Sequence, residues 1–87
     1  MPVYMVEREL KGIAMNDLAA AQQLAIKTSN AYTAQGMPMR YIRSTFAPGE
    51  GRCMCLFEAS SAEDVKRLNN EAKIPYTRVV EAFDLTP

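Results

Sequence analysis

The chain has 87 residues, and its ten Lys and Arg residues balance its ten Asp and Glu residues. This length fits one domain with a single core, and the balanced charge provides no excess of positive charge for binding nucleic acid or an anionic membrane. Histidine is absent, which excludes Ser-His-Asp and Cys-His catalysis and histidine-based metal sites.

The apolar segments are short, and none approaches the roughly 20 residues of a membrane-spanning helix. The first residues lack the basic and then apolar pattern of a secretory signal. The chain contains only two cysteines. Together these features predict a cytoplasmic protein, since thiols stay reduced in that compartment.

The first half of the chain predicts a strand followed by a long helix. Residues 3–10 are rich in strand-forming side chains. Apolar residues then recur at three- and four-residue spacing from Leu18 to Tyr32, which is typical of one buried helix face. Asn16 is the expected N-cap of this helix, and Gly36 is the expected residue at its C-terminal end.

The second half predicts a hairpin, a shorter helix and a last strand. Residues 39–46 and 52–58 read as two strands joined by the turn sequence APGEG. Ser60 and Glu63 fit a capping box that starts the second helix, which ends before Pro75. Residues 77–85 complete the series as a strand.

The resulting order β-α-β-β-α-β predicts an α+β, ferredoxin-like fold formed by residues 1–87 as a single domain. In this fold, two crossover helices pack on one face of a four-stranded antiparallel sheet. The helices leave the other face of the sheet uncovered.

The uncovered face is expected to be apolar, because three strand segments are apolar at both odd and even positions: VYMV, CMCLF and VVEAF. Large exposed apolar patches mark interaction sites. We therefore expect a homodimer in which the helix-free sheet faces pack back to back. The alternative is that the strands are short and this face is only half exposed.

The alternation of side chains along the strands predicts which face the cysteines occupy. If Ile42 and Phe46 face the helices together with Met54 and Leu56, the opposite, dimer-facing side carries Tyr41, Arg43, Thr45, Cys53, Cys55 and Phe57. The two cysteines then share one side, with Cα atoms about 7 Å apart, at the limit for a disulfide. The thiols act either as small buried hydrophobes or as part of a metal site.

A pocket for a small anionic ligand is a further expectation for the dimer-facing side. Arg43 lies in the middle of its strand, where a charge requires a carboxylate or a ligand anion. Glu81 interrupts an apolar strand in the same way, and Tyr41 adds a phenol beside Cys55. The alternative is a salt bridge from Arg43 to Glu7 or Glu81, or a position in water. Arg8 reads as a solvated surface charge.

Three motifs carry a resemblance to a known family: VER at 6–8, Cys-x-aromatic-Glu-Ala at 55–59, and IPYTRVVE at 74–81. The sequence resembles a family of small bacterial proteins, mostly described as a domain of unknown function and in one branch as nickel-binding. The resemblance implies a ferredoxin-like dimeric α/β barrel. It also implies nickel or another transition metal, with Cys55 and Cys53 as ligands and carboxylates from Glu7 and Glu81.

The leading functional hypothesis is a non-catalytic dimeric domain that binds a small ligand or a transition metal. The chain has no nucleophile–base pair and no phosphate-binding loop. One alternative is a small cofactor-free enzyme, resembling monooxygenases or isomerases of the dimeric barrel type. In such an enzyme Glu7 or Glu81 would act as base and Arg43 would orient an anionic substrate. The other alternative is a purely structural, self-associating module.

Overall fold

Four strands and two helices follow one another in the order that the sequence predicts. The computed structural model describes residues 1–87. Its elements are β1 (Val3–Glu9), α1 (Met15–Ala34), β2 (Met39–Ala47), β3 (Arg52–Ala59), α2 (Ala62–Ala72) and β4 (Arg78–Ala82). Neither helix is long and apolar enough to cross a membrane.

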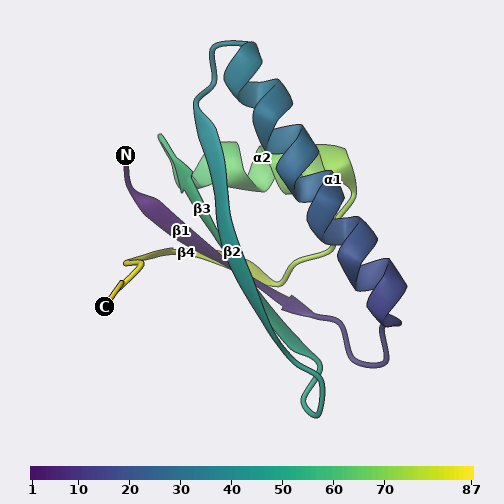
Figure 1. Ribbon diagram of the computed structural model, residues 1–87. Coiled ribbons are helices and arrows are strands. Elements are labelled where there is room, and N and C mark those ends of the chain that lie inside the picture. Colours follow the sequence, from purple (N-terminus) through teal and green to yellow (C-terminus); the bar gives the residue numbers. More distant parts are fainter.

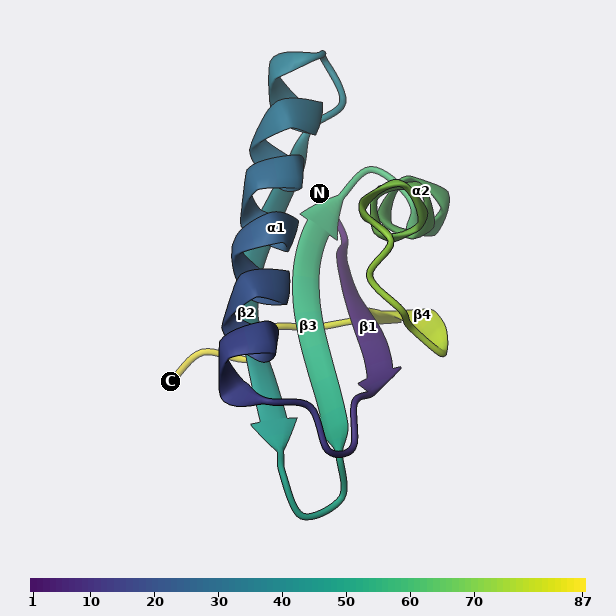
Figure 2. The ribbon, with the colours of Figure 1, turned by 90° about the vertical axis from the view of Figure 1, so that its right-hand side faces the viewer.

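The strands form one antiparallel sheet in the order β2-β3-β1-β4. Both helices lie on the same side of it, with α1 along β2 and α2 near β3 and β4 (Figures 1 and 2). Each helix connects two strands that are not neighbours in the sheet, since β3 separates β1 from β2 and β1 separates β3 from β4. This is the ferredoxin-like arrangement, and the predicted α+β fold is confirmed.

The observed helix caps differ from the predicted ones, by two residues in α1 and by one residue in α2. The N-cap of α1 is Ala14, whose carbonyl accepts a hydrogen bond from the Leu18 amide at 3.0 Å. Asn16 therefore lies within the first turn and caps nothing. In α2 the cap is Ser61, not Ser60, and its side chain accepts from the Asp64 amide at 3.2 Å. Gly36 follows α1 with a φ of +87°, as expected for a residue that ends a helix.

The core lies between the helices and the sheet. The largest fully buried side chains come from the two central strands and from α2: Phe57, Leu68, Val6, Val65 and Asn69. The longer helix contributes less, and its buried residues are Ala25, Ser29 and Tyr32. Helix α1 therefore covers the sheet with small side chains along much of its length.

A single extra residue in β2 changes which side chains face the helices. Tyr41 pairs with Phe57 and Arg43 pairs with Leu56, so Ile42 is a β-bulge. Because of this residue, Tyr41 lies on the helix side of the sheet while Arg43 lies on the opposite side. The predicted assignment of both residues to one face was wrong.

The cysteines also lie on the other face from the one predicted. Cys53, Cys55 and Phe57 are buried on the helix side of β3, whereas Met54 and Leu56 point away from the helices and are half-buried. Both sets are apolar, so the alternation along β3 is compatible with either orientation. The cysteines face the side of the sheet on which α1 lies.

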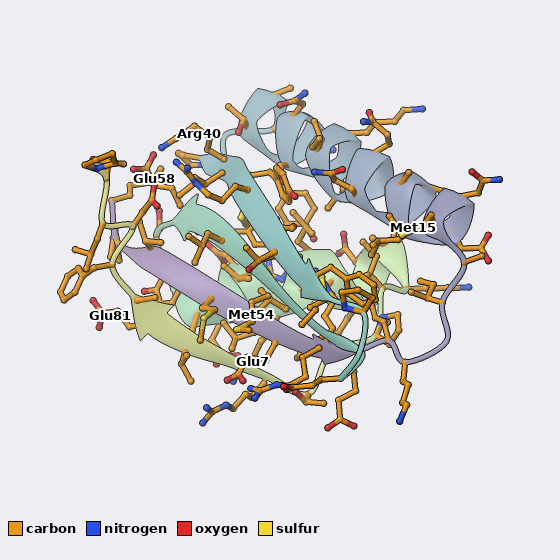
Figure 3. All side chains as sticks on the ribbon, turned by 60° about the horizontal axis from the view of Figure 1, so that its bottom comes forward. Glu7, Met15, Arg40, Met54, Glu58 and Glu81 are labelled. Carbon is orange, nitrogen blue, oxygen red and sulfur yellow. The ribbon has the colours of Figure 1, made fainter.

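The helix-free side, called the outer face below, carries a row of half-buried apolar side chains. Its members come from all four strands: Val3, Met5, Ile42, Met54, Leu56 and Val80. Figure 3 looks onto this face, with Met54 and Glu7 in front of the sheet. The expectation of an apolar helix-free face is met, although different residues from those predicted form it.

Candidate functional site

A cavity of about 150 Å³ lies between α1 and the helix side of the sheet. Most of its lining is apolar: Leu10, Leu18, Ala21, Ala25, Phe46 and Ile74. Two of these residues are alanines on the face of α1 that packs on the sheet, and their short side chains leave the space open. The polar part of the wall consists of Arg8, Gln22, Tyr41 and Ser44, next to the two cysteines.

Arg8 is the charged residue of this cavity, and only 4% of it is exposed. Its Nη2 donates to Asn69 Oδ1 at 2.7 Å, its Nη1 to the Pro75 carbonyl at 3.1 Å and its Nε to Cys55 Sγ at 3.4 Å. None of the three acceptors is a carboxylate, and none of the salt bridges in the structure involves Arg8. Burying a charge without a counter-charge is costly. The guanidinium is therefore well hydrogen-bonded but electrostatically uncompensated.

Cys53 and Cys55 lie beside Arg8 in the cavity wall. They are two residues apart on β3, so their side chains point to the same side. Both are free thiols, buried at 2% and 6% exposure, and their Sγ atoms are 3.9 Å apart. The pKa of the Cys53 thiol is raised to about 11, mainly by burial and to a smaller extent by the neighbouring Cys55. Cys53 is therefore protonated at neutral pH.

A chain of hydrogen bonds connects the buried thiol of Cys55 to the surface of α1. Gln22 Nε2 donates to the Tyr41 hydroxyl at 3.0 Å, and that hydroxyl is hydrogen-bonded to Ser44. Ser44 Oγ in turn donates to Cys55 Sγ at 2.9 Å. The Tyr41 ring is fixed by an edge-to-face contact with Phe57, with centroids 5.5 Å apart. The sulfur of Cys55 thus accepts hydrogen bonds from both Ser44 and Arg8.

Of the residues that the sequence assigned to a binding site, only Tyr41, Cys53 and Cys55 line this cavity. Arg43 lies on the outer face with 57% of its side chain exposed and pairs with Asp84 at 3.0 Å. The predicted gathering of Arg43 and Glu81 around Tyr41 and Cys55 does not occur, because the bulge at Ile42 places Arg43 on the opposite side.

The two predicted glutamates are also outside the cavity. Glu7 lies on the outer face, where it pairs with Arg52 at 3.1 Å and with Arg78. Glu81 is exposed on β4, in register with Tyr4. Of the alternatives for Arg43, the salt bridge to one of these glutamates is wrong, since its partner is Asp84, whereas the position in water agrees with its exposed side chain.

Sequence reasoning missed Arg8 and Ser44. The interpretation of Arg8 as a solvated surface charge was wrong, since its side chain points into the protein between β1 and α2. The available signal was its spacing from Tyr4 and Val6, which places all three residues on one side of a strand. The signal becomes decisive only once β1 is known to be a central strand of the sheet.

The three motifs that carried the family resemblance meet around Arg8. Arg8 itself belongs to the first motif, Cys55 to the second and the Pro75 carbonyl to the third. The third motif also holds β1 through Thr77, whose amide and hydroxyl donate to the Glu7 carbonyl at 2.7 and 3.0 Å. The loop between α2 and β4 is thereby fixed against the end of β1.

Comparison with known proteins identifies the family. A family model described as nickel responsive protein SCO4226-like matches residues 4–82. The chain belongs to this SCO4226-like family. Among solved structures, it is similar to that of SCO4226 from Streptomyces coelicolor A3(2), with a TM-score of 0.80 and 21% sequence identity over 97% of this chain and 99% of that one. No curated protein matches the sequence. The similarity to the solved structure supports the fold of this SCO4226-like protein.

Proposed function

We propose that this SCO4226-like protein is a non-catalytic binding domain whose cavity takes a small molecule with an apolar body and one anionic group. The observation that carries the proposal is the buried, uncompensated charge of Arg8 in the wall of an otherwise apolar cavity. An anionic group of the ligand would supply the missing counter-charge and form charge-assisted hydrogen bonds with the guanidinium.

The size of the cavity limits the ligand. Its volume of about 150 Å³ lies below the roughly 300 Å³ at which typical ligand pockets begin. A cavity of this order holds one benzene-sized molecule. Small aromatic or short-chain carboxylates therefore match both its volume and its charge.

The enzyme alternative receives less support from the same cavity. A cofactor-free enzyme of the type expected needs a carboxylate base in an apolar pocket. The lining residues include no Asp or Glu. The two candidates, Glu7 and Glu81, lie elsewhere, and Glu7 already neutralises two arginines. The cavity contains binding groups but not the expected base.

Nickel, which the family description names, does not fit the side chains of this chain. No group of three or more His, Cys, Asp or Glu residues lies close enough to hold a metal ion. Nickel(II) in proteins favours imidazole, thiolate and carboxylate ligands, and the cavity offers two thiols beside a positive charge. We therefore assign no step or structural role to nickel in this site.

The ligand proposal is tested by titrating the protein with benzoate and with the neutral analogue benzamide. Binding is measured from the chemical shifts of the backbone amides in NMR spectra. We expect benzoate to shift residues around the cavity and benzamide to bind at least about tenfold more weakly. Arg8→Met should remove the preference for benzoate. Arg40→Met, on the outer face, is the matched control because Arg40 pairs with Glu58 far from the cavity.

A second variant keeps the test informative if Arg8→Met does not fold. Ala21→Leu adds three carbon atoms to the cavity wall without changing a charge, and it should abolish benzoate binding by filling the space. Equal binding of benzoate and benzamide by the wild-type protein, or unchanged benzoate binding by Ala21→Leu, would contradict the proposal.

A second proposal concerns assembly, and the apolar outer face supports it. We propose that two copies pack through this face as a homodimer of the α/β-barrel type. Six half-buried apolar side chains from four strands lie there without a helix to cover them. Several charged residues around them are already paired within the chain, as Arg40 is with Glu58 and Arg43 with Asp84. A second copy would therefore bury apolar surface without leaving these charges unpaired.

The assembly proposal is tested by sedimentation velocity over a range of protein concentrations. Leu56→Lys places a charge at the centre of the outer face and should yield monomers. Leu24→Lys is the matched control, since it makes the same chemical change at a 41% exposed position on α1. A wild-type protein that stays monomeric at all concentrations would rule the dimer out.

A further inference from the structure

We propose that Cys53 and Cys55 together form a binding site for one soft monovalent metal ion, Cu(I), at the inner end of the cavity. This inference goes beyond the proposed ligand, and it rests on the thiol pair and not on the apolar part of the cavity. Three properties of the site carry it: the separation of the sulfurs, the number and type of donors, and the charge beside them.

The separation of the sulfurs suits a single bridging ion. The two Sγ atoms are 3.9 Å apart. A metal–sulfur bond of about 2.3 Å allows one ion to bind two sulfurs that are up to roughly 4.6 Å apart. Both cysteines lie on β3, which is paired with β1 on one side and β2 on the other. The thiols are thus held at bridging distance by the centre of the sheet.

The donor set favours copper(I) over divalent ions. Thiolates are soft ligands that select Cu(I), which accepts low coordination numbers. Structural zinc sites need four protein donors, whereas no third Cys, His, Asp or Glu joins these two cysteines. Two sulfurs alone are therefore a sufficient set for Cu(I) and an insufficient one for zinc or nickel.

The charge of the complex matches the charge of its surroundings. One Cu(I) and two thiolates carry a net charge of −1, and the uncompensated guanidinium of Arg8 lies 3.4 Å from Cys55 Sγ. A divalent ion with the same two thiolates would be neutral and would leave Arg8 without a counter-charge. Ser44 adds a hydrogen bond to the same sulfur at 2.9 Å, an outer contact of the kind that orients metal ligands.

The binding step balances without a change of oxidation state. Each thiol loses its proton to solvent, two copper–sulfur bonds form, and the ion enters already as Cu(I). The anionic ligand proposed above would use the same guanidinium. The two ligands should therefore exclude each other.

The experiment is an anaerobic titration of the metal-free protein with Cu(I) buffered by the chromophoric chelator bicinchoninate. We expect one Cu(I) per chain and a sulfur-to-copper charge-transfer absorption in the ultraviolet. We also expect that, once copper is bound, neither cysteine reacts with a thiol reagent. Cys53→Ser and Cys55→Ser should each weaken binding by roughly 100-fold or more, since even outer contacts of a metal site are worth 10- to 100-fold. Met37→Leu, in the loop between α1 and β2, is the control for a thioether ligand.

The outcomes separate this inference from the proposed function. Binding of Cu(I) that is equally strong in the Cys53→Ser, Cys55→Ser double variant would overturn the metal site, and so would a wild-type protein that does not withdraw Cu(I) from the chelator. Circular dichroism confirms that each variant is folded. Benzoate binding is measured on the same double variant: if it persists there, the ligand proposal stands without the metal site.

Discussion

Arg8 on β1 donates a hydrogen bond to Asn69 on α2 across 2.7 Å, and both residues are almost completely buried. Asn69 is itself held in place, because its Nδ2 donates to the Val65 carbonyl at 2.8 Å. The hydrogen bond to the Asn69 side-chain oxygen is thus the shortest of the three that the Arg8 guanidinium donates. This pair ties α2 to the central strand and fixes the guanidinium at the cavity wall.

Replacing Asn69 tests how much the buried cation depends on this contact. Asn69→Ala should lower the free energy of unfolding by about 3 kcal/mol, because it removes an acceptor from a buried charge. Asn70→Ala, at the exposed neighbouring position, should change it by less than about 0.5 kcal/mol. Urea unfolding followed by circular dichroism measures both. Similar values for the two variants would show that Arg8 is not strongly held by α2.

Tyr32 gives the stability a dependence on alkaline pH. Its hydroxyl donates to Glu71 Oε2 at 2.5 Å, and burial together with this carboxylate raises the pKa of Tyr32 from 10.0 to about 12. The folded state therefore holds the proton more tightly than the unfolded state. The stabilisation is complete below pH 10 and is lost as the pH rises through about 12.

The comparison of wild type with Tyr32→Phe isolates this effect from other groups that titrate in the same range. Below pH 10 we expect wild type to be more stable by about 1 kcal/mol, the usual contribution of a hydrogen bond. The difference should shrink as the pH is raised from 10 to 12. Thermal unfolding at several pH values measures it, and a difference that stays constant with pH would contradict the assignment.

The order of elements could be predicted because local signals separate them. Gly36 and Pro38 stop the long helix, and Pro75 separates α2 from β4. These residues act through their own backbone preferences, which do not depend on the rest of the fold. The same reasoning missed the α1 cap by two residues, because Ala14 has no capping side chain to mark it. It missed the α2 cap by one residue, because Ser60 and Ser61 both have a side chain that fits the cap position.

The site could not be predicted to the same degree, because it depends on which way β2 and β3 face. The apolar pattern of β3 permits both orientations, and the bulge at Ile42 has no signature in a single sequence. One extra residue moved Arg43 away from the cavity. The buried position of Arg8 also depends on the strand order, which brings α2 over the central strand β1. Long-range contacts of this kind leave no local pattern.

Gly51 is expected to be the glycine least tolerant of substitution. It has a φ of +72°, and a Cβ built there would lie 2.4 Å from the Lys11 Cα and 2.7 Å from its amide nitrogen. Gly12 has a similar φ of +81° but open space around it. Gly12→Ala should therefore cost about 1 kcal/mol from backbone strain alone. Gly51→Ala should cost more than about 2 kcal/mol, because the clash is with backbone atoms.

The comparison of these two glycine variants separates strain from steric conflict. Gly49→Ala serves as a further control, since Gly49 has neither a positive φ nor a close neighbour. Chemical denaturation measures all three variants. Equal losses for Gly12→Ala and Gly51→Ala would mean that the loop carrying Lys11 moves aside at little cost.

Two neighbouring residues on β3 distinguish the core from the outer face. Phe57 is fully buried beneath the helices, whereas Leu56 is half-buried on the outer face. Phe57→Ala should lower the free energy of unfolding by about 3–5 kcal/mol at any protein concentration, because the cavity it leaves lies inside one chain. Leu56→Ala should cost less than about 1 kcal/mol at the lowest concentrations, where the chain is monomeric.

The cost of Leu56→Ala should then rise with protein concentration if two copies bury this face, because association stabilises the folded state by mass action. The cost of Phe57→Ala should stay constant over the same series. Urea unfolding of wild type and both variants at several concentrations measures this difference. The proposal fails if neither the cost of Leu56→Ala nor the urea midpoint of the wild-type protein changes with concentration. The outer face would then stay in contact with water.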